Sequence, residues 1–170
     1  YKACLMDGSL SSGYHAADLI SDLMGRGNSS LLYERLVKQQ SIFTSITAFI
    51  TGSVDPGLLV VQAKVDEQTD IEKADALLNE EIDHFRKGNF DDSELQKVKN
   101  QAEASIVFSE VEVITRTMNL AQAAALGDPD LVNQETALIQ QVSPELIKDT
   151  AGQILEPENG STLWYRAEKK

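Results

Sequence analysis

Apolar residues recur every three or four positions through most of the chain, which is the pattern of helices that bury one face. The first such segment covers residues 14–24 and ends at Gly25, and the second covers about residues 30–40. Beyond residue 70 the same spacing predicts five further helices, at about residues 71–87, 91–106, 111–126, 130–141 and 144–156. Two of these helices begin with known signals of a helix N-terminus. Asp91 and Glu94 have capping-box spacing, and Ser143 precedes a proline.

A period of two replaces this spacing in the middle of the chain and predicts two strands. From Ile42 onward the period is two, with Ile46, Ala48 and Ile50 on one face, and a second alternating run extends from Leu59 to Val65. The turn signal Asp55-Pro56-Gly57 lies between the runs, so they are expected to pair as an antiparallel hairpin. Residues 1–6 and 160–166 are predicted to join this hairpin, because a hairpin alone is barely stable. The pattern therefore predicts an α+β fold, with helices covering one face of an antiparallel sheet.

Length and composition change this picture little. The 170 residues suit a single domain, residues 1–170, and the apolar and charged fractions of 42% and 25% are ordinary. The net charge of −12 argues against nucleic acid as a partner. No apolar run approaches the ~18 residues that a membrane span requires. Because the sequence opens inside a strand, we expect it to be an excised part of a longer chain, with any targeting signal upstream.

Few residues could carry chemistry. Glu80 and His84 share one helix face and could form one edge of a metal site, but zinc binds three or four ligands, so a solvated surface is favoured. His15 starts the first helix and is interpreted as a surface residue near the cap rather than as part of a cleft. Cys4 cannot form an internal disulfide and is interpreted as a small core residue, and Trp164 is given a core or sheet-surface role. The residues alone predict no catalytic site.

One stretch carries a family resemblance. Residues 29–36, Ser-Ser-Leu-Leu-Tyr-Glu-Arg-Leu, resemble a segment of the pitrilysin and insulinase-type zinc peptidases, whose metal motif is the inverted His-x-x-Glu-His. The resemblance covers nearly the whole chain, through the helix pair split at residues 25–28, the hairpin turn and residues 123–129 and 142–147. It is a resemblance to the second, carboxy-terminal domain of a two-domain half, particularly in the bacterial members.

The resemblance implies a fold of four to six antiparallel strands backed by helices. In that family, pairs of such domains form half of a clam-shell chamber that encloses a peptide. The zinc is held by the first domain of one half, and this sequence, with its two histidines, contains no His-x-x-Glu-His. The resemblance therefore implies no cofactor in this chain and zinc in the full-length parent. The partners that it implies are a peptide substrate, an amino-terminal domain and a second homologous half or subunit.

The resemblance also points to two positions where family members bind substrate. In those members an arginine follows the helix leucine and a tyrosine comes seven residues later. Alignment on Leu36 places Val37 and Thr44 at these positions, and neither side chain can substitute. Arg35 comes one residue early and should point to another helix face unless the helix end is distorted. No catalytic or metal residue is therefore predicted, and the substrate-binding residues stay open.

Three interpretations remain. The favoured one is the supporting, chamber-forming domain of a zinc metallopeptidase whose missing arginine and tyrosine come from another half or subunit. The second is a non-catalytic scaffold homologue. The third is a peptide-binding module that accepts a strand at one edge of its sheet.

Overall fold

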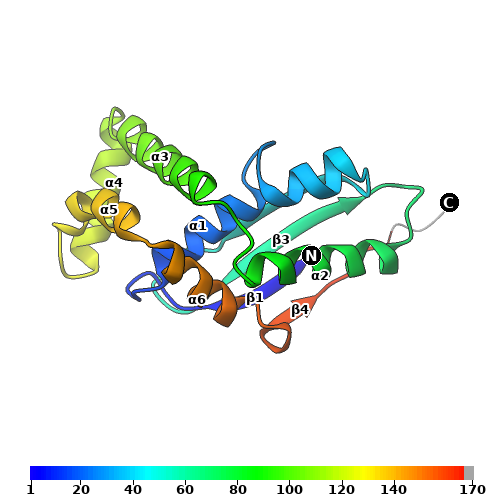
Figure 1. Ribbon diagram of the computed structural model, residues 1–170. Helices are drawn as coiled ribbons and strands as arrows, with labels where there is room; N and C mark the ends of the chain where they lie inside the picture. The colour runs from blue at the N-terminus through cyan, green and yellow to red at the C-terminus, as the bar shows by residue number, and fades with distance from the viewer. Residues whose placement is uncertain (167–170) are drawn as a thin grey trace.

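A four-stranded antiparallel sheet runs through the protein, as the computed structural model shows for residues 1–166 (Figure 1). The strands lie in the order β2-β3-β1-β4. Their bounds are β1 Lys2–Met6, β2 Phe43–Ile50, β3 Gly57–Val65 and β4 Gly160–Thr162. The hairpin pairs Ala48 with Val61, and β1 lies against β3 with Cys4 opposite Leu59. The predicted α+β class and the antiparallel sheet are therefore confirmed.

The last strand is shorter than the predicted residues 160–166. Its ladder continues through Leu163, whose backbone nitrogen donates to the carbonyl oxygen of Tyr1 at 2.8 Å. In this ladder Lys2 pairs with Thr162, and no strand pairing of Trp164 is found within residues 1–166. Trp164 is 43% exposed, so a core role for this side chain is wrong.

Six of the seven predicted helices form as α-helices, with small shifts at their ends. Their bounds are α1 Tyr14–Gly25, α2 Ile71–Arg86, α3 Asp92–Ser109, α4 Val113–Ala125, α5 Leu131–Gln141 and α6 Pro144–Ile154, followed by the 3₁₀ turn η2, Pro157–Asn159. Both predicted caps are present, since Asp91 and Glu94 make the capping box and Ser143 Oγ accepts from the backbone nitrogen of Leu146 at 3.1 Å. Within residues 1–166, no helix combines the length and apolar content that crossing a bilayer requires.

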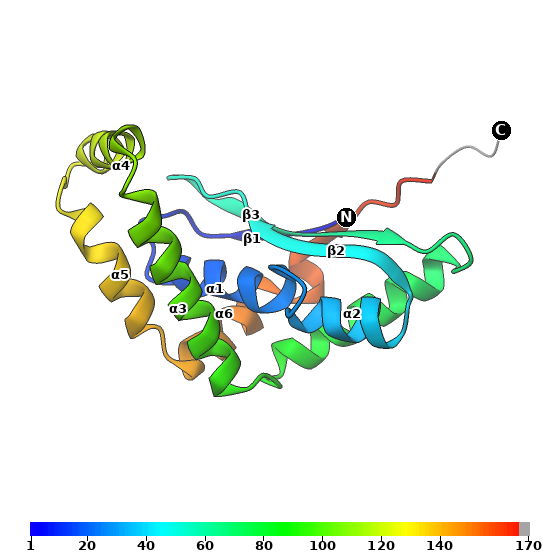
Figure 2. The ribbon, with the colours of Figure 1, turned by 90° about the horizontal axis from the view of Figure 1, so that it is seen from above.

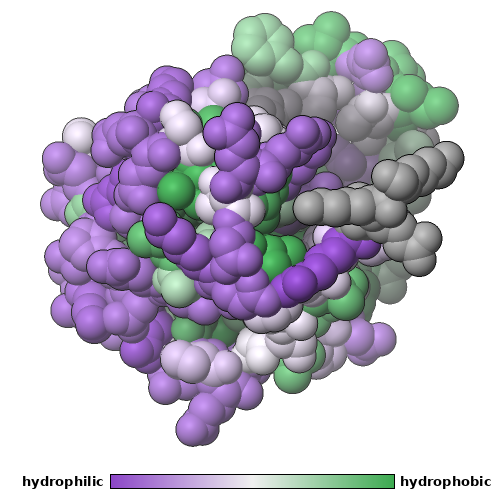
Figure 3. Space-filling model, turned by 90° about the vertical axis from the view of Figure 1, so that its right-hand side faces the viewer, coloured by the Kyte–Doolittle hydropathy of each residue, from purple (hydrophilic) through white to green (hydrophobic). Residues whose placement is uncertain are grey.

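The helices cover one face of the sheet. Figure 2 shows α1, α2 and α6 beneath the strands, while no helix of the described residues covers the opposite face. Helices α3, α4 and α5 gather at one end of the sheet. The opposite end has a mostly hydrophilic surface with scattered apolar side chains (Figure 3), in keeping with the net charge.

The core lies between the sheet and these helices. Each fully buried large side chain contributes about 1.5–3 kcal/mol through the hydrophobic effect. They include Leu19, Ile20, Met24, Leu36, Leu59, Val61 and Ile147.

Gly25 has a packing role that the sequence did not indicate. It is the last residue of α1, and a Cβ built there would lie 2.1 Å from the backbone nitrogen of Ala48 in β2. In the turn after α1, the glycine with a left-handed conformation is Gly27, with φ of 79°. The absent side chain of Gly25 therefore allows α1 to approach the strand closely, while the chain reverses two residues later.

The second helix differs from its expectation. An ordinary helix over residues 30–40 was predicted, but residues Tyr33–Gln39 form a π-helix, here η1. Its wide turns are marked by the backbone nitrogen of Gln40, which donates to the carbonyl oxygen of Arg35 at 3.1 Å. Over ten residues the apolar spacings of the two helix types are too alike to be distinguished by pattern.

Candidate functional site

Three irregularities of the backbone lie in the short segment between Tyr33 and Ser45. The first is the π-helix η1, and the second is Ser41, which has φ of 53° although it is not glycine. The third is a shift of register in β2, where Thr44 is an extra residue between the paired residues Phe43 and Ser45. π-helical turns and β-bulges are frequent next to functional sites, and strained residues cluster there. This segment is therefore the candidate functional site.

Val37 belongs to η1 and packs against the hydrophobic core. Its neighbour Leu36 is fully buried, and Val37 itself is partly buried among apolar side chains. Its isopropyl group thus serves packing and offers no hydrogen-bond donor to a ligand.

Thr44 lies in the bulge of β2 and is exposed to solvent. Its hydroxyl donates to the carbonyl oxygen of Lys64 on β3, with Oγ1 and O 3.2 Å apart. The hydroxyl is therefore already hydrogen-bonded within the sheet. Val37 and Thr44 consequently face different surroundings, one the core and the other the solvent.

Arg35, which was expected to point to another helix face, contacts helix α2. Its Nη1 lies 2.6 Å from Oε2 of Glu81 on α2, and both side chains are partly buried. The distortion of η1 therefore does not turn this guanidinium into the position of a substrate-binding arginine, because a carboxylate already holds it.

The edge strand β2 is the part of this segment that is open to a partner. Among the described residues β2 pairs with β3 alone, so its other side carries no strand. Ser45, Thr47 and Phe49 are exposed along it, and they belong to the face that no helix within residues 1–166 covers. β4 forms the other edge but has only three residues. The sequence had left the choice of edge open, and the structure makes β2 the longer one.

The residues present do not fit a zinc site. His15 lies on α1 and His84 on α2, and within residues 1–166 no three potential ligands lie together. Glu80 and His84 supply at most two ligands, fewer than zinc binds in proteins. His84 is exposed, and its Nδ1 lies 3.5 Å from Nδ2 of Asn89.

His15 was interpreted as a surface residue, which is wrong. It is partly buried and lines a cavity between α1, α4 and α5. Burial lowers the pKa of its imidazole, and the Glu135 carboxylate partly opposes this. Because Glu135 is 120 positions further along the chain, no local pattern could have indicated the contact. Cys4 is half-buried, in keeping with its predicted packing role, and burial raises the pKa of its thiol.

Comparison with known families gives one match. The family model described as the peptidase M16 inactive domain matches residues 8–102, which is more than half of the chain. Among curated proteins nothing matched.

Solved structures share the fold. A protease from Helicobacter pylori superposes with a TM-score of 0.85 at 15% identity, over 94% of this chain and 38% of that one. The inactive peptidase domain of a "putative zinc protease" from Bordetella parapertussis gives a TM-score of 0.83 at 19% identity, over 94% of this chain and 88% of that one. An M16 inactive domain from Pseudomonas fluorescens gives 0.77 at 15% identity, over 94% and 38%. This chain thus spans well under half of the Helicobacter pylori protease, and these identities show the fold alone.

Proposed function

Because the chain belongs to the peptidase M16 inactive-domain family, we propose that it is the non-catalytic, supporting domain of a zinc metallopeptidase. On this proposal residues 1–170 are one domain of a longer protein, and the zinc and its ligands lie outside this chain. The separation of His15 and His84 on different helices supports a zinc site outside this chain. A structural neighbour described as the inactive domain of a zinc protease supports the proposal that residues 1–170 are one domain of a longer protein.

The function proposed for the domain is to form part of the wall of a peptide-binding chamber. One observation carries it, namely the open edge of β2 beside an uncovered sheet face. An unpaired strand edge presents a row of backbone N–H and C=O groups, and an extended peptide can add to it as a further strand. Thr47 and Phe49 would then meet alternate side chains of the peptide.

Peptide binding tests this proposal. A fluorescently labelled, extended ten-residue peptide would be titrated with the purified chain, and anisotropy would report binding. The same peptide would be tested with its backbone N-methylated at alternate residues, in the two possible sets. Methylation of the set that faces β2 should weaken binding at least tenfold, because it removes the ladder donors. Methylation of the other set serves as the matched control and should leave the affinity nearly unchanged.

Two results would count against the chamber-wall function. One is the absence of binding by any extended peptide at millimolar concentration. The other is equal binding by both methylated sets, since strand addition requires one set to differ. Amide resonances of residues 45–50 provide the location, because they should shift when the peptide adds to β2.

A scaffold without a peptide-binding role is the alternative, and Val37 and Thr44 favour it. With no donor at the first position and an engaged hydroxyl at the second, the segment lacks the side chains that resembled peptidases use on substrate. A scaffold predicts stable association with a homologous subunit and no peptide affinity. The titration above therefore separates the two functions.

A partner domain is proposed from one apolar surface. Helix α4 and the end of α3 expose large apolar side chains, several of them at least 70% exposed. This α3–α4 surface consists of Phe108, Val111, Val113, Ile114 and Met118. Contiguous exposed apolar surface marks interaction sites. Since the Helicobacter pylori protease, which shares the fold, has a considerably longer chain, we propose that a further domain of the parent protein covers it.

The test of this contact is association in solution. The chain and the separately produced upstream domain of its parent should co-elute in size-exclusion chromatography. Ile114→Ser should abolish co-elution, whereas the control Thr117→Ser on the same helix should not. Co-elution that survives Ile114→Ser together with Phe108→Ser would rule this surface out.

A further inference from the structure

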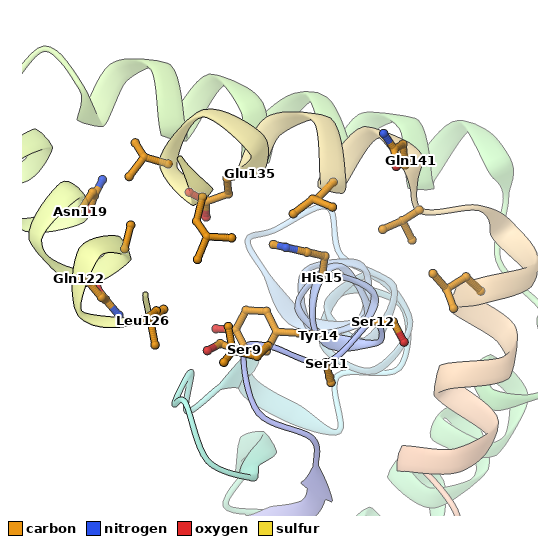
Figure 4. A pocket seen from close by; sticks show the side chains of 17 residues that line it. Ser9, Ser11, Ser12, Tyr14, His15, Asn119, Gln122, Leu126, Glu135 and Gln141 are labelled. Carbon is orange, nitrogen blue, oxygen red and sulfur yellow. The ribbon is translucent and has the colours of Figure 1, made fainter. Parts of the chain in front are cut away.

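A groove at one end of the molecule belongs to neither the β2 edge nor the segment of Val37 and Thr44. It has a volume of about 650 Å³, within the usual range of ligand sites (Figure 4). Its floor is the β1–α1 loop with the first turn of α1, and α4, α5 and the start of α6 form its walls. The groove therefore depends on segments that are more than 100 residues apart in sequence.

The walls of the groove carry large aliphatic side chains. Leu126 comes from the end of α4, Leu131 and Leu138 come from α5, and Leu146 comes from α6. Leu10, in the β1–α1 loop, also lines the groove and is 62% exposed. Burial of such surface by a ligand is favourable, so these walls fit an apolar side chain.

Uncharged polar groups lie between the aliphatic ones. Tyr14 and His15 project into the groove from α1, and Asn119 and Gln122 face it from α4 (Figure 4). Amide side chains both donate and accept hydrogen bonds, and so does a phenol, which matches the N–H and C=O groups of a peptide.

One hydroxyl in the groove is unsatisfied. Ser11 Oγ is buried and finds no hydrogen-bond partner within the described part of the chain. Ser11 lines the groove, but its Oγ is closed off from solvent, so this oxygen is not among the groups that a ligand would meet.

The charge of the groove has one sign. Among residues 1–166, Glu135 on α5 is the only carboxylate that lines it, and no lysine or arginine of these residues does so. Burial is the main cause that raises the pKa of Asp18 on α1, and the nearby Glu135 carboxylate raises it further, so the two carboxyl groups interact. A cationic group on the ligand would therefore be attracted, and an anionic one repelled.

From the aliphatic walls, the neutral hydrogen-bonding groups and the single carboxylate, we propose that this groove binds a peptide segment that carries a leucine-like side chain next to a lysine or arginine. The aliphatic side chain lies against Leu131 and Leu138, and the basic side chain pairs with Glu135. The inference rests on the proposed function in one respect, namely that peptides are the ligands, and it adds a second binding site and a preference for sequence.

The experiment uses three labelled peptides of equal length, with Leu-Lys, Leu-Gln or Ala-Lys at the centre. Each would be titrated into the intact chain, into Glu135→Gln and into the control Glu67→Gln, an exposed carboxylate in the β3–α2 turn. Glu135→Gln should weaken the Leu-Lys peptide about three- to fivefold and leave the Leu-Gln peptide unchanged, because only the first has a charge to pair. The Ala-Lys peptide should bind about tenfold more weakly than Leu-Lys to every variant, because it buries less apolar surface.

The two histidines give an independent measurement of location. On addition of the Leu-Lys peptide the imidazole resonances of His15, in the groove, should shift, whereas those of His84, exposed on α2, should not. Tyr14→Phe removes one hydroxyl from the groove while keeping the ring, and it should reduce affinity for both leucine peptides equally.

Several outcomes would overturn the inference. Peptides that bind with no effect of Glu135→Gln and no shift of His15 would exclude the groove while leaving strand addition at β2 intact. Absence of binding by any peptide would reject both proposals. Equal binding of n-hexylamine and the Leu-Lys peptide would make the site one for small amines. Self-association in sedimentation, abolished by Glu135→Gln, would assign the groove to a second copy of the chain.

Discussion

The guanidinium of Arg35 lies 2.6 Å from the carboxylate of Glu81 and joins the π-helix η1 to helix α2. The pair is partly buried, with 31% and 18% of the two side chains exposed. It connects the segment that leads into β2 with a helix on the same side of the sheet. Arg35, which lies two positions before Val37, is therefore engaged in a structural ion pair.

This relationship predicts a measurable coupling. Arg35→Met and Glu81→Gln should each lower the free energy of unfolding by about 1 kcal/mol, and the double variant should lose less than the sum. The pair of Lys38 and Glu34 is the matched control, because it is also joined by one short contact but is 49% and 40% exposed. Its coupling should be about 0.3–0.5 kcal/mol, as for other exposed pairs. Urea unfolding of the single and double variants gives the coupling free energy of each pair. Equal coupling free energies would show that burial adds nothing to the Arg35 pair.

Replacing Val37 and Thr44 by the arginine and tyrosine of the resembled peptidases should have different effects on stability. Val37→Arg places a charge against the core and should destabilise the fold by about 1–3 kcal/mol. Thr44→Tyr should change stability by no more than about 0.5 kcal/mol, because the position is exposed and tyrosine favours strands. Thermal unfolding of the two variants provides the comparison. A Val37→Arg variant as stable as the parent would mean that η1 can turn this side chain into solvent.

The order of elements could be predicted from the sequence because local signals agree with tertiary packing. The alternation from Leu59 to Val65 reflects a strand with one buried face, and Ser143 caps α6 just as its sequence pattern predicted. Periodicity and caps are properties of neighbouring residues, so they can be read without knowledge of the fold.

The site could not be predicted in the same way, because its features arise from distant contacts. The bulge at Thr44 has no sequence mark, since it depends on the register between β2 and β3. Gly25 fits the pattern of a helix stop, but its main constraint is the backbone of Ala48. His15 enters a groove only because α5 folds back over the start of α1.

The role of Gly25 leads to a contrast between two glycine substitutions. Gly25→Ala should destabilise the protein by about 2 kcal/mol or more, because the new Cβ would overlap the backbone of β2 at Ala48. Gly152→Ala, within helix α6, should stabilise it by about 0.5–1 kcal/mol, because no atom lies within 4 Å of its Cβ position and alanine is the better helix former. Urea midpoints of the two variants measure this difference. A loss of stability in Gly152→Ala, or none in Gly25→Ala, would contradict the packing of α1 on β2 and the open space beside α6.

The carboxyl group of Asp18 should make stability depend on pH. Burial raises the pKa of this group above its usual 3.8, with a smaller opposing effect from Arg26. The folded protein therefore binds a proton more tightly than the unfolded chain, and stability falls as pH rises from 3.8 through the raised pKa.

Replacement of that carboxyl group should remove the penalty. Asp18→Asn is expected to be more stable than the parent at pH 7, above the usual pKa of 3.8 at which the unfolded chain loses its proton, and the gain should vanish below pH 3.8, where both states are protonated. Asp55→Asn, in the exposed β2–β3 turn, is the control and should have little effect at either pH. Urea unfolding at pH 7 and pH 3.5 measures the two differences. A gain of equal size at both values would have to come from the amide itself, and the charge of Asp18 would then carry no penalty in the folded protein.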